Sequence, residues 1–176
     1  MPSFRFEPLD PERHDRDGFE CGVPALNDYL RRHARKDAER HLAAVFVMVA
    51  EAAPSTIIGF YSLSNFSVEL AGLPAELIRK LPRYPRVPAT LIGRLARDQR
   101  FPGTGSLLLM DALLRAYAQT AVSGSVTVVA EAKDERAGGF YRKHGFALLG
   151  LESNRWHLPM ETIGRLARFS DRSSQV

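Results

Sequence analysis

The sequence has a single cysteine, Cys21, among its 176 residues. One cysteine cannot form a disulfide within the chain, and such usage is typical of proteins made for a reducing compartment. Long apolar runs are also missing: the longest, Leu42 to Ala50, is far shorter than the roughly 20 residues of a membrane-spanning helix. Arg5, Glu7 and Asp10 interrupt any apolar segment near the N-terminus, which argues against a signal peptide. We therefore expect a cytoplasmic protein with no membrane segment.

Metal-ligand spacings are absent as well. His33, His41, His144 and His157 do not combine with the cysteine in a pattern typical of a zinc site, so we expect no metal. Hydrophobic residues make up 45% and charged residues 25% of the chain, ordinary globular values that exclude a disordered or fibrous protein. The charge excess is small, because 24 Lys and Arg face 20 Asp and Glu for a net +4. This balance permits an anionic partner and identifies none.

The sequence does contain the interleaved strand and helix patterns of an α/β (α+β) protein. β-branched runs and apolar alternation predict strands at residues 3–8, 42–50, 56–67, 90–96, 126–130, 146–149 and 156–158. Apolar periodicity predicts helices at residues 23–40, 107–121, 135–144 and 159–169. Four prolines punctuate residues 73–88, which hold at most one short helix. We expect one domain over residues 1–169 and a disordered polar tail over residues 170–176.

A glycine-containing turn, Arg100-Phe-Pro-Gly-Thr-Gly105, joins a predicted strand to a predicted helix. Helix N-termini present free backbone N–H groups, and the helix dipole there favours an anion. Glycine lets the backbone approach a phosphate, and an arginine adds a charge-assisted hydrogen bond. The spacing is neither that of a P-loop nor that of a dinucleotide fingerprint. A tight turn without a ligand explains the segment equally well.

A second segment, Phe140-Tyr141-Arg-Lys-His-Gly145-Phe146, places an aromatic pair on a predicted helix. Gly145 suits the position after the helix C-terminus, where a left-handed conformation is common. As a bare pattern, Phe140 and Phe146 are core residues, and a core position is also the favoured interpretation of Tyr141.

Taken together, in this order, the two segments resemble the GNAT superfamily of acetyl-CoA-dependent N-acyltransferases. The first is similar to its Arg/Gln-x-x-Gly-x-Gly/Ala pyrophosphate motif and the second to its Phe-Tyr-x-x-x-Gly-Phe segment. The similarity extends to the GNAT toxins of bacterial toxin-antitoxin modules over nearly the whole chain. The segments that carry it are Phe19-x-Cys21-Gly22, Leu26-Asn27-x-Tyr29-Leu30-Arg31, Leu81-Pro82-Arg83-Tyr84-Pro85, Gly93-Arg94-Leu95-Ala96, Leu107-Leu108-Leu109-x-Asp111-Ala112 and Leu158-Pro159-Met160.

The resemblance implies a GNAT fold, with a mixed, mostly antiparallel central sheet, a splayed pair of central strands and flanking helices. It also implies acetyl-CoA as the acetyl donor. Tyr141 is then the general acid that protonates the CoA thiolate, which fits a phenol because its reference pKa of about 10 keeps it protonated at neutral pH. The implied cofactor-binding residues are Leu95, Ala96, Arg97, Arg100, Gly103, Thr104, Gly105, Ser106 and Phe140.

The glycine loop departs from this toxin branch, which usually has a longer Gln-Gly-x-Gly-Leu-Gly form. If the motif is aligned from the helix side, Gly103 and Gly105 fill the required places. If it is aligned from the strand side, a Leu-Gly step is missing and the pyrophosphate cradle is incomplete. We favour the helix-side alignment, because it keeps helix N-terminal donors directed at the phosphate. Pro102 has no N–H to donate.

Toxins of this family acetylate the amine of the amino acid on aminoacyl-tRNA and so block translation, and the resemblance implies the same substrate here. It further implies a ribbon-helix-helix antitoxin as partner and a homodimer. An RNA substrate requires phosphate contacts, although basic side chains can equally be solvated surface. The candidate RNA-binding residues are Arg94, a first-helix cluster of Arg31, Arg32, Arg35 and Lys36, and a loop cluster of Arg79, Lys80, Arg83 and Arg86.

Two other functions stay open at this point. A GNAT enzyme could acetylate a small amine or a protein N-terminus, with the basic clusters as inert surface. A degenerate GNAT fold could serve only as a binding partner of the antitoxin, which the shortened glycine loop would permit. The salt dependence of substrate binding separates the first from a tRNA enzyme.

Overall fold

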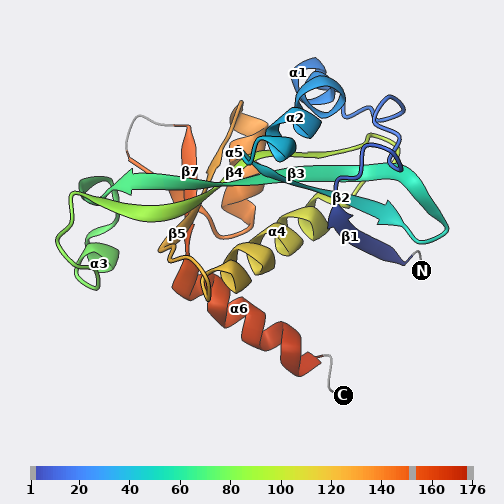
Figure 1. Ribbon diagram of the computed structural model, residues 1–176. Helices are drawn as coiled ribbons and strands as arrows, with labels where there is room; N and C mark the ends of the chain where they lie inside the picture. Colours follow the sequence, from blue (N-terminus) through green and yellow to red (C-terminus); the bar gives the residue numbers. More distant parts are fainter. Residues whose placement is uncertain (1–2, 151–153, 174–176) are drawn as a thin grey trace. The chain divides into compact units, whose positions relative to one another are not determined.

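The computed structural model describes residues 3–150 and 154–173 (Figure 1). In this part of the chain the strands join into one sheet in the order β1-β2-β3-β4-β5-β7-β6. The strands are β1 (Phe4–Pro8), β2 (Ala44–Ala50), β3 (Ala53–Glu69), β4 (Arg86–Arg97), β5 (Thr127–Glu131), β6 (Ala147–Leu148) and β7 (Arg155–Pro159). The pairs are mostly antiparallel and β4–β5 is parallel, which confirms the mixed sheet. The splaying of the central pair stays a prediction.

The helical segments match the predicted ones with changed bounds. They are α1 (Pro24–Asp28), a π-helical turn η1 (Tyr29–His33), α2 (Ala34–Glu39), a 3-10 turn η2 (Leu70–Gly72), α3 (Ala75–Ile78), α4 (Gly105–Gln119), α5 (Glu135–Lys143) and α6 (Met160–Ser173). The predicted helix at 23–40 is thus three successive stretches. None of the helices in residues 3–150 and 154–173 is long and apolar enough to cross a membrane.

The C-terminal helix extends beyond its predicted end. Disorder was expected from residue 170, yet α6 continues to Ser173, so that expectation is wrong for residues 170–173. The polar residues there include neither glycine nor proline, and polar side chains alone do not break a solvated helix. Residues 174–176 of the predicted tail lie outside the described residues.

The chain folds as two compact units. Unit 1 comprises Met1–Ser64 and Ile92–Ala112, and unit 2 comprises Asn65–Leu91 and Leu113–Val176. Each boundary falls inside an element, namely β3, β4 and α4. The single domain expected over residues 1–169 stays a prediction, and each unit is described by itself below.

In unit 1, strands β1, β2 and β3 lie side by side and pair antiparallel, as Figure 1 shows. Because successive strand residues face opposite sides, Val45 and Val47 turn to one face, where they pack with Leu30 and Ala34 of the α1–η1–α2 segment. Gly59 turns to the other face, toward Leu108 of α4. Helices therefore cover both faces of this part of the sheet.

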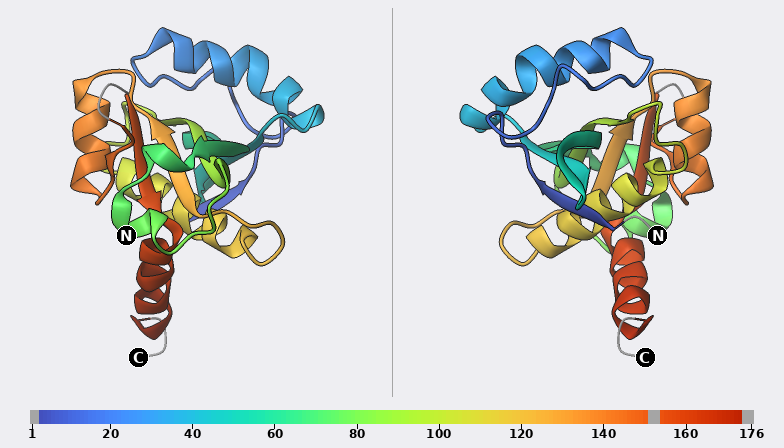
Figure 2. Two further views of the ribbon diagram at one scale, coloured as in Figure 1. Left: turned by 90° about the vertical axis from the view of Figure 1, so that its left-hand side faces the viewer. Right: turned by 90° about the vertical axis from the view of Figure 1, so that its right-hand side faces the viewer.

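In unit 2, the 65–91 segment and β5 share a small apolar core. Val68, Leu73, Val87 and Val129 are buried in it, and partly buried residues of α3 pack against it. A separate contact places α5 on β7: a Cβ at Gly138 would lie 3.1 Å from the ring of Trp156. Figure 2 shows α5 and α6 from two further sides. Trp156 is thus part of the core, with 6% of its surface exposed.

Candidate functional site

The loop after β4 is anchored by the buried carboxylate of Asp98, which is 0% exposed. This carboxylate accepts hydrogen bonds from the backbone N–H groups of Glu20 (2.9 Å) and Arg100 (2.9 Å). The Arg100 guanidinium donates to both oxygens, through Nε at 2.8 Å and Nη2 at 2.7 Å. Burial alone raises the pKa of Asp98, but these hydrogen bonds outweigh burial and lower the pKa below its usual value. The start of the glycine loop is therefore fixed to unit 1.

Arg100 is engaged with the protein itself. Besides Asp98, its Nη2 donates to the carbonyl of Gly18 at 3.0 Å. Its side chain is still 56% exposed, so its charge remains at the loop surface. Sequence reasoning named Arg100 as a direct phosphate contact and missed its acceptor, Asp98. The signal for Asp98 was an acid between a buried strand and an arginine two residues later.

The glycine turn itself leads directly into α4. Gly103 has a φ of +83° and open space around it. Thr104 is buried; its hydroxyl donates to the carbonyl of Phe101 (2.8 Å) and its carbonyl accepts from Leu108 N–H (3.2 Å). Gly105 is the first residue of α4, which agrees with the helix-side alignment, and Ser106 follows it in the exposed first turn. First-turn N–H groups have no acceptor within their own helix, so this end suits an anion.

The C-terminal end of β4 holds the predicted pantetheine-binding residues. Ala96 is buried, while Leu95 and Arg97 are partly exposed. A Cβ at Gly59 would lie 3.0 Å from the carbonyl oxygen of Ala96, so glycine lets the backbone of β4 approach β3 closely. Nη1 of Arg97 donates to the carbonyl of Asp98 at 3.3 Å. Unit 1 therefore brings Leu95 to Arg97 and the glycine loop together along one continuous segment.

Tyr141 lies in unit 2, on α5, and is 6% exposed. Its ring contacts those of Phe140 (5.4 Å between centroids) and Phe146 (5.2 Å). Burial raises the pKa of Tyr141 to about 12. The phenol is therefore fully protonated at neutral pH and able to donate a hydrogen bond.

The sequence around Tyr141 explains how α5 holds it. The carboxylate of Asp134 caps the helix by accepting from Ala137 N–H at 2.8 Å. At the other end Gly145 has a φ of +88°, so the predicted glycine after the helix C-terminus is confirmed. Since Gly138 packs against Trp156, the helix has one fixed face on β7.

The first-helix cluster is largely occupied by internal partners. Nη2 of Arg31 donates to the carbonyls of Asp17 (3.2 Å) and Phe19 (2.8 Å). Arg32 pairs with Asp28 at 2.9 Å and Arg35 with Glu39 at 2.6 Å, while Lys36 is exposed. Two of the four charges in this cluster are thus offset by carboxylates four residues away in the α1–η1–α2 segment.

Part of the loop cluster borders a pocket of about 710 Å³ in unit 2, with Tyr84, which is 63% exposed, in its wall. Arg83 and Arg86 line the pocket as well. Arg86 lies at the start of β4 and not in the loop, and it donates to Ser67 Oγ at 3.0 Å. Outside the pocket, Lys80 pairs with Glu161 at 3.0 Å, and Arg79 is exposed.

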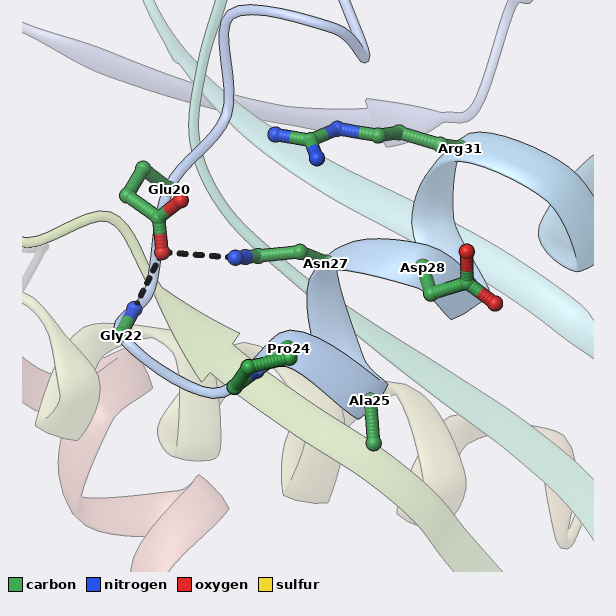
Figure 3. A pocket seen from close by; sticks show the side chains of 7 residues that line it. All are labelled: Glu20, Gly22, Pro24, Ala25, Asn27, Asp28 and Arg31. Atoms are coloured by element: carbon green, nitrogen blue, oxygen red, sulfur yellow. Dashed lines mark hydrogen bonds between the residues drawn. The ribbon is translucent and has the colours of Figure 1, made fainter.

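A second pocket, of about 570 Å³, opens beside α1 in unit 1 (Figure 3). Its central contact is the carboxylate of Glu20, which accepts from Asn27 Nδ2 at 2.6 Å and Gly22 N–H at 2.7 Å. These two hydrogen bonds lower the pKa of Glu20. Figure 3 shows Arg31 and Asp28 on the helix side of the same pocket. No sequence motif identified this pocket.

Arg94, the remaining predicted RNA contact, is exposed on β4 and lies over the ring of Tyr29.

Within residues 3–150 and 154–173, no group of three or more His, Cys, Asp or Glu side chains is placed to hold a metal ion.

Known proteins resemble this chain over most of its length, although no protein-family model matches it. It is 34% identical over 169 residues to a probable toxin TacT of Sinorhizobium fredii (strain NBRC 101917 / NGR234), covering 91% of this chain and 93% of that protein. It is 32% identical over 132 residues to a tRNA-acetylating toxin of Mycobacterium tuberculosis (strain ATCC 25618 / H37Rv), covering 74% and 76%.

Solved structures give the same result. A tyrosine-to-phenylalanine variant of KacT superposes with a TM-score of 0.86 and 27% identity, over 93% of this chain and 98% of that one. AtaT complexed with acetyl-methionyl-tRNAfMet has a TM-score of 0.85 and 27% identity, over 93% and 99%. AtaTR bound with acetyl-CoA has a TM-score of 0.80 and 28% identity, over 93% and 97%. The chain therefore belongs to the GNAT superfamily of N-acetyltransferases, in the branch of bacterial toxins that includes TacT.

Proposed function

We propose that this protein is an acetyl-CoA-dependent N-acetyltransferase that acetylates the primary amine of aminoacyl-tRNA, blocks translation and acts in the cytoplasm as the toxin of a toxin-antitoxin pair. The observation that carries the proposal is the similarity of most of the chain to a tRNA-acetylating toxin and to a toxin solved with acetylated tRNA. The protonated phenol of Tyr141 supports the same chemistry, because the departing thiolate needs a proton donor.

The residues of unit 1 fit acetyl-CoA. Backbone groups of Leu95, Ala96 and Arg97 would bind the pantetheine arm at the end of β4. The pyrophosphate would lie on the glycine turn and the first turn of α4, where Gly103 leaves open space and the helix presents N–H donors. Arg100 would add positive charge from its exposed guanidinium while Asp98 holds it in place. Thr104, Gly105 and Ser106 complete this set in unit 1, and Phe140, on α5, is the predicted cofactor-binding residue of unit 2.

Acetyl-CoA, when bound, supplies an acetyl group activated as a thioester. The substrate's amine nitrogen forms a bond to the acetyl carbon, the carbon–sulfur bond breaks, and the electron pair of that bond leaves with sulfur. Tyr141 donates its phenolic proton toward this thiolate, and the amine releases one proton as it becomes an amide. Tyr141 regains a proton from solvent. With a pKa of about 12, the phenol is a weak acid, so its proton moves to sulfur only as the carbon–sulfur bond breaks and negative charge builds up there.

The tRNA would bind through those basic side chains that keep exposed charge. Lys36, Arg79 and Arg83 meet this condition, as does Arg94. The paired residues Arg32, Arg35, Lys80 and Arg86 would contribute less, because nearby carboxylates offset them. Arg31 would act mainly by fixing the loop at Phe19.

The protein partner in this proposal is an antitoxin of the ribbon-helix-helix class, and the assembly is a homodimer. Membership of the toxin branch, two relatives of which are called toxins, supports an antitoxin as partner, whereas its class and the homodimer rest on the family resemblance alone. A binding assay with the product of an adjacent short reading frame, followed by the mass of the complex in solution, tests both statements.

Acetyl transfer from labelled acetyl-CoA to total charged tRNA tests the proposal directly. Label should appear in charged tRNA and not in deacylated tRNA, free amino acids or a peptide with a free N-terminus. Transfer to free amino acids or peptides alone would favour the small-amine or N-terminal enzyme. Failure to bind acetyl-CoA in calorimetry would favour a fold that only binds its antitoxin.

A further inference from the structure

Arg94 differs from the other arginines of unit 1 in its surroundings. Its guanidinium carbon lies 3.7 Å from the centroid of the Tyr29 ring. The residue is exposed on β4, immediately before Leu95. Among the described residues no carboxylate pairs with its side chain. A guanidinium placed over an aromatic ring gives up none of its N–H donors to a carboxylate or carbonyl, so they stay available.

The ring beneath Arg94 is held in place by the surrounding structure. Tyr29 is 4% exposed, and its ring stacks on that of Phe60 with centroids 6.1 Å apart. Its hydroxyl donates to the carboxylate of Asp37 at 3.0 Å. Burial, followed by this hydrogen bond and the charge of Asp37, raises the pKa of Tyr29 to about 12, so the hydroxyl stays a donor. The backbone of Arg94 is fixed as well, since its N–H donates to Ser62 Oγ at 3.1 Å.

Tyr29 also begins the π-helical turn η1. Such turns are rare, are less favourable than an α-helix and are found frequently at functional sites. Here the wide turn separates α1 from α2, so that Tyr29 and Asp37 come from two helical stretches and meet at one hydrogen bond.

We propose that Arg94 binds a backbone phosphate of the RNA substrate, and that Tyr29 and Asp37 are positioning residues that hold its guanidinium on the exposed side of β4. This inference rests on the proposed function, which supplies the RNA. A planar guanidinium matches two phosphate oxygens with two parallel N–H donors. Arg31, Arg97 and Arg100 are less suited to this role, because backbone carbonyls or Asp98 already occupy their donors. A simple surface stack would not require a buried tyrosine whose hydroxyl is hydrogen-bonded to a carboxylate.

Binding of uncharged tRNA across a series of salt concentrations tests the role of Arg94 without acetyl transfer. Arg94→Ala should weaken binding about tenfold, as expected for lost hydrogen bonds to a charged group. It should also reduce the slope of log affinity against log salt by about 0.7 to 0.9, the contribution of one phosphate contact. Arg155→Ala is the control, since Arg155 also lies over an aromatic ring, that of Phe66 at 5.2 Å, but its guanidinium pairs with Glu131 at 3.0 Å. The control should leave affinity and slope unchanged.

A double-mutant cycle tests the positioning residues. Tyr29→Leu should weaken tRNA binding by nearly the same factor as Arg94→Ala, and the double variant should be no weaker than Arg94→Ala alone. Tyr29→Phe keeps the ring and loses the bond to Asp37, so its effect should be smaller, and Asp37→Ala, which removes the acceptor, should match it. A purely structural role of Tyr29 would lower thermal stability and leave the effects on tRNA affinity additive.

The outcomes separate this inference from the proposed function. If the wild-type protein acetylates charged tRNA and Arg94→Ala binds tRNA like wild type, the inference is wrong and the proposed function stands. If binding depends on Arg94 as described but no charged tRNA is acetylated, the proposed function is wrong and the phosphate contact stands. Wild-type protein that does not bind tRNA at all overturns both.

Discussion

Replacing Asp98 with alanine is expected to destabilise unit 1 and to weaken acetyl-CoA binding together. The substitution removes a fully buried carboxylate that accepts from the backbone N–H groups of Glu20 and Arg100. It also releases the Arg100 guanidinium from its two hydrogen bonds. The loop that leads to Gly103 then loses its anchor to the residue 18–20 segment.

The size of the loss follows from these contacts. A buried N–H group left without an acceptor costs about 1–3 kcal/mol, and two such groups are affected. The pair with Arg100 adds only about 0–1 kcal/mol, because that side chain is 56% exposed and screened by solvent. Allowing for water that reaches the loop, we expect Asp98→Ala to lower the free energy of unfolding by about 3 kcal/mol.

Urea denaturation measures this loss, and calorimetry measures the affinity for acetyl-CoA in the same variants. Exposed Asp171 on α6 offers the matched control, and Asp171→Ala should change the free energy of unfolding by less than about 0.5 kcal/mol. The hydrogen bonds lower the folded-state pKa of Asp98. Its stabilisation is therefore present above the unfolded-state pKa, about 3.9, and is lost as pH falls through the lower folded-state pKa. A loss below about 1 kcal/mol at neutral pH would refute the account of the anchor.

Two further predictions concern other parts of the chain. Gly103→Ala and Gly139→Ala both place a methyl group in open space, but only Gly103 has a positive φ, +83°. Gly103→Ala should lower the free energy of unfolding by about 1–2 kcal/mol and weaken acetyl-CoA binding, whereas Gly139→Ala, inside α5, should raise it by about 0.5–1 kcal/mol. Equal effects of the two substitutions in urea denaturation would show that the backbone conformation of the glycine does not determine the change in stability. The pH profile of kcat should rise as the substrate amine loses its proton, near about pH 8, and should show no fall from Tyr141 deprotonation before the profile nears the pKa of Tyr141 at about 12. A falling limb that begins near pH 9 and disappears in Tyr141→Phe would contradict this assignment.

Local features were the part of the structure that the sequence predicted well. Gly145 has the left-handed backbone expected after α5, and the glycine turn leads into α4 at Gly105, two positions before the predicted start at residue 107. The β-branched runs also predicted strands β2 and β3, although β3 begins at Ala53 and not at residue 56. Each of these depends on residues that are neighbours in the chain, so composition and periodicity carry the information.

Contacts between residues that are far apart in the chain could not be predicted from the sequence. Asp98 meets Glu20 across 78 positions of the sequence, and no local pattern encodes that pairing. For the same reason Arg31 looked like exposed charge, yet it donates to the carbonyl of Phe19. The support of Arg94 by Tyr29 was missed too, because it depends on a π-helical turn and on packing between a helix and β4.

The mass of the 3′-terminal aminoacyl-adenosine, released by nuclease from charged tRNA after incubation with acetyl-CoA, shows whether the protein acetylates aminoacyl-tRNA. The account predicts a gain of one acetyl group on the amino nitrogen with the wild-type protein. It predicts that Tyr141→Phe lowers the rate by about 10²- to 10⁴-fold, the usual contribution of a general acid, while the variant stays folded. An unchanged mass for every charged tRNA, from wild-type protein that binds acetyl-CoA, would contradict the account.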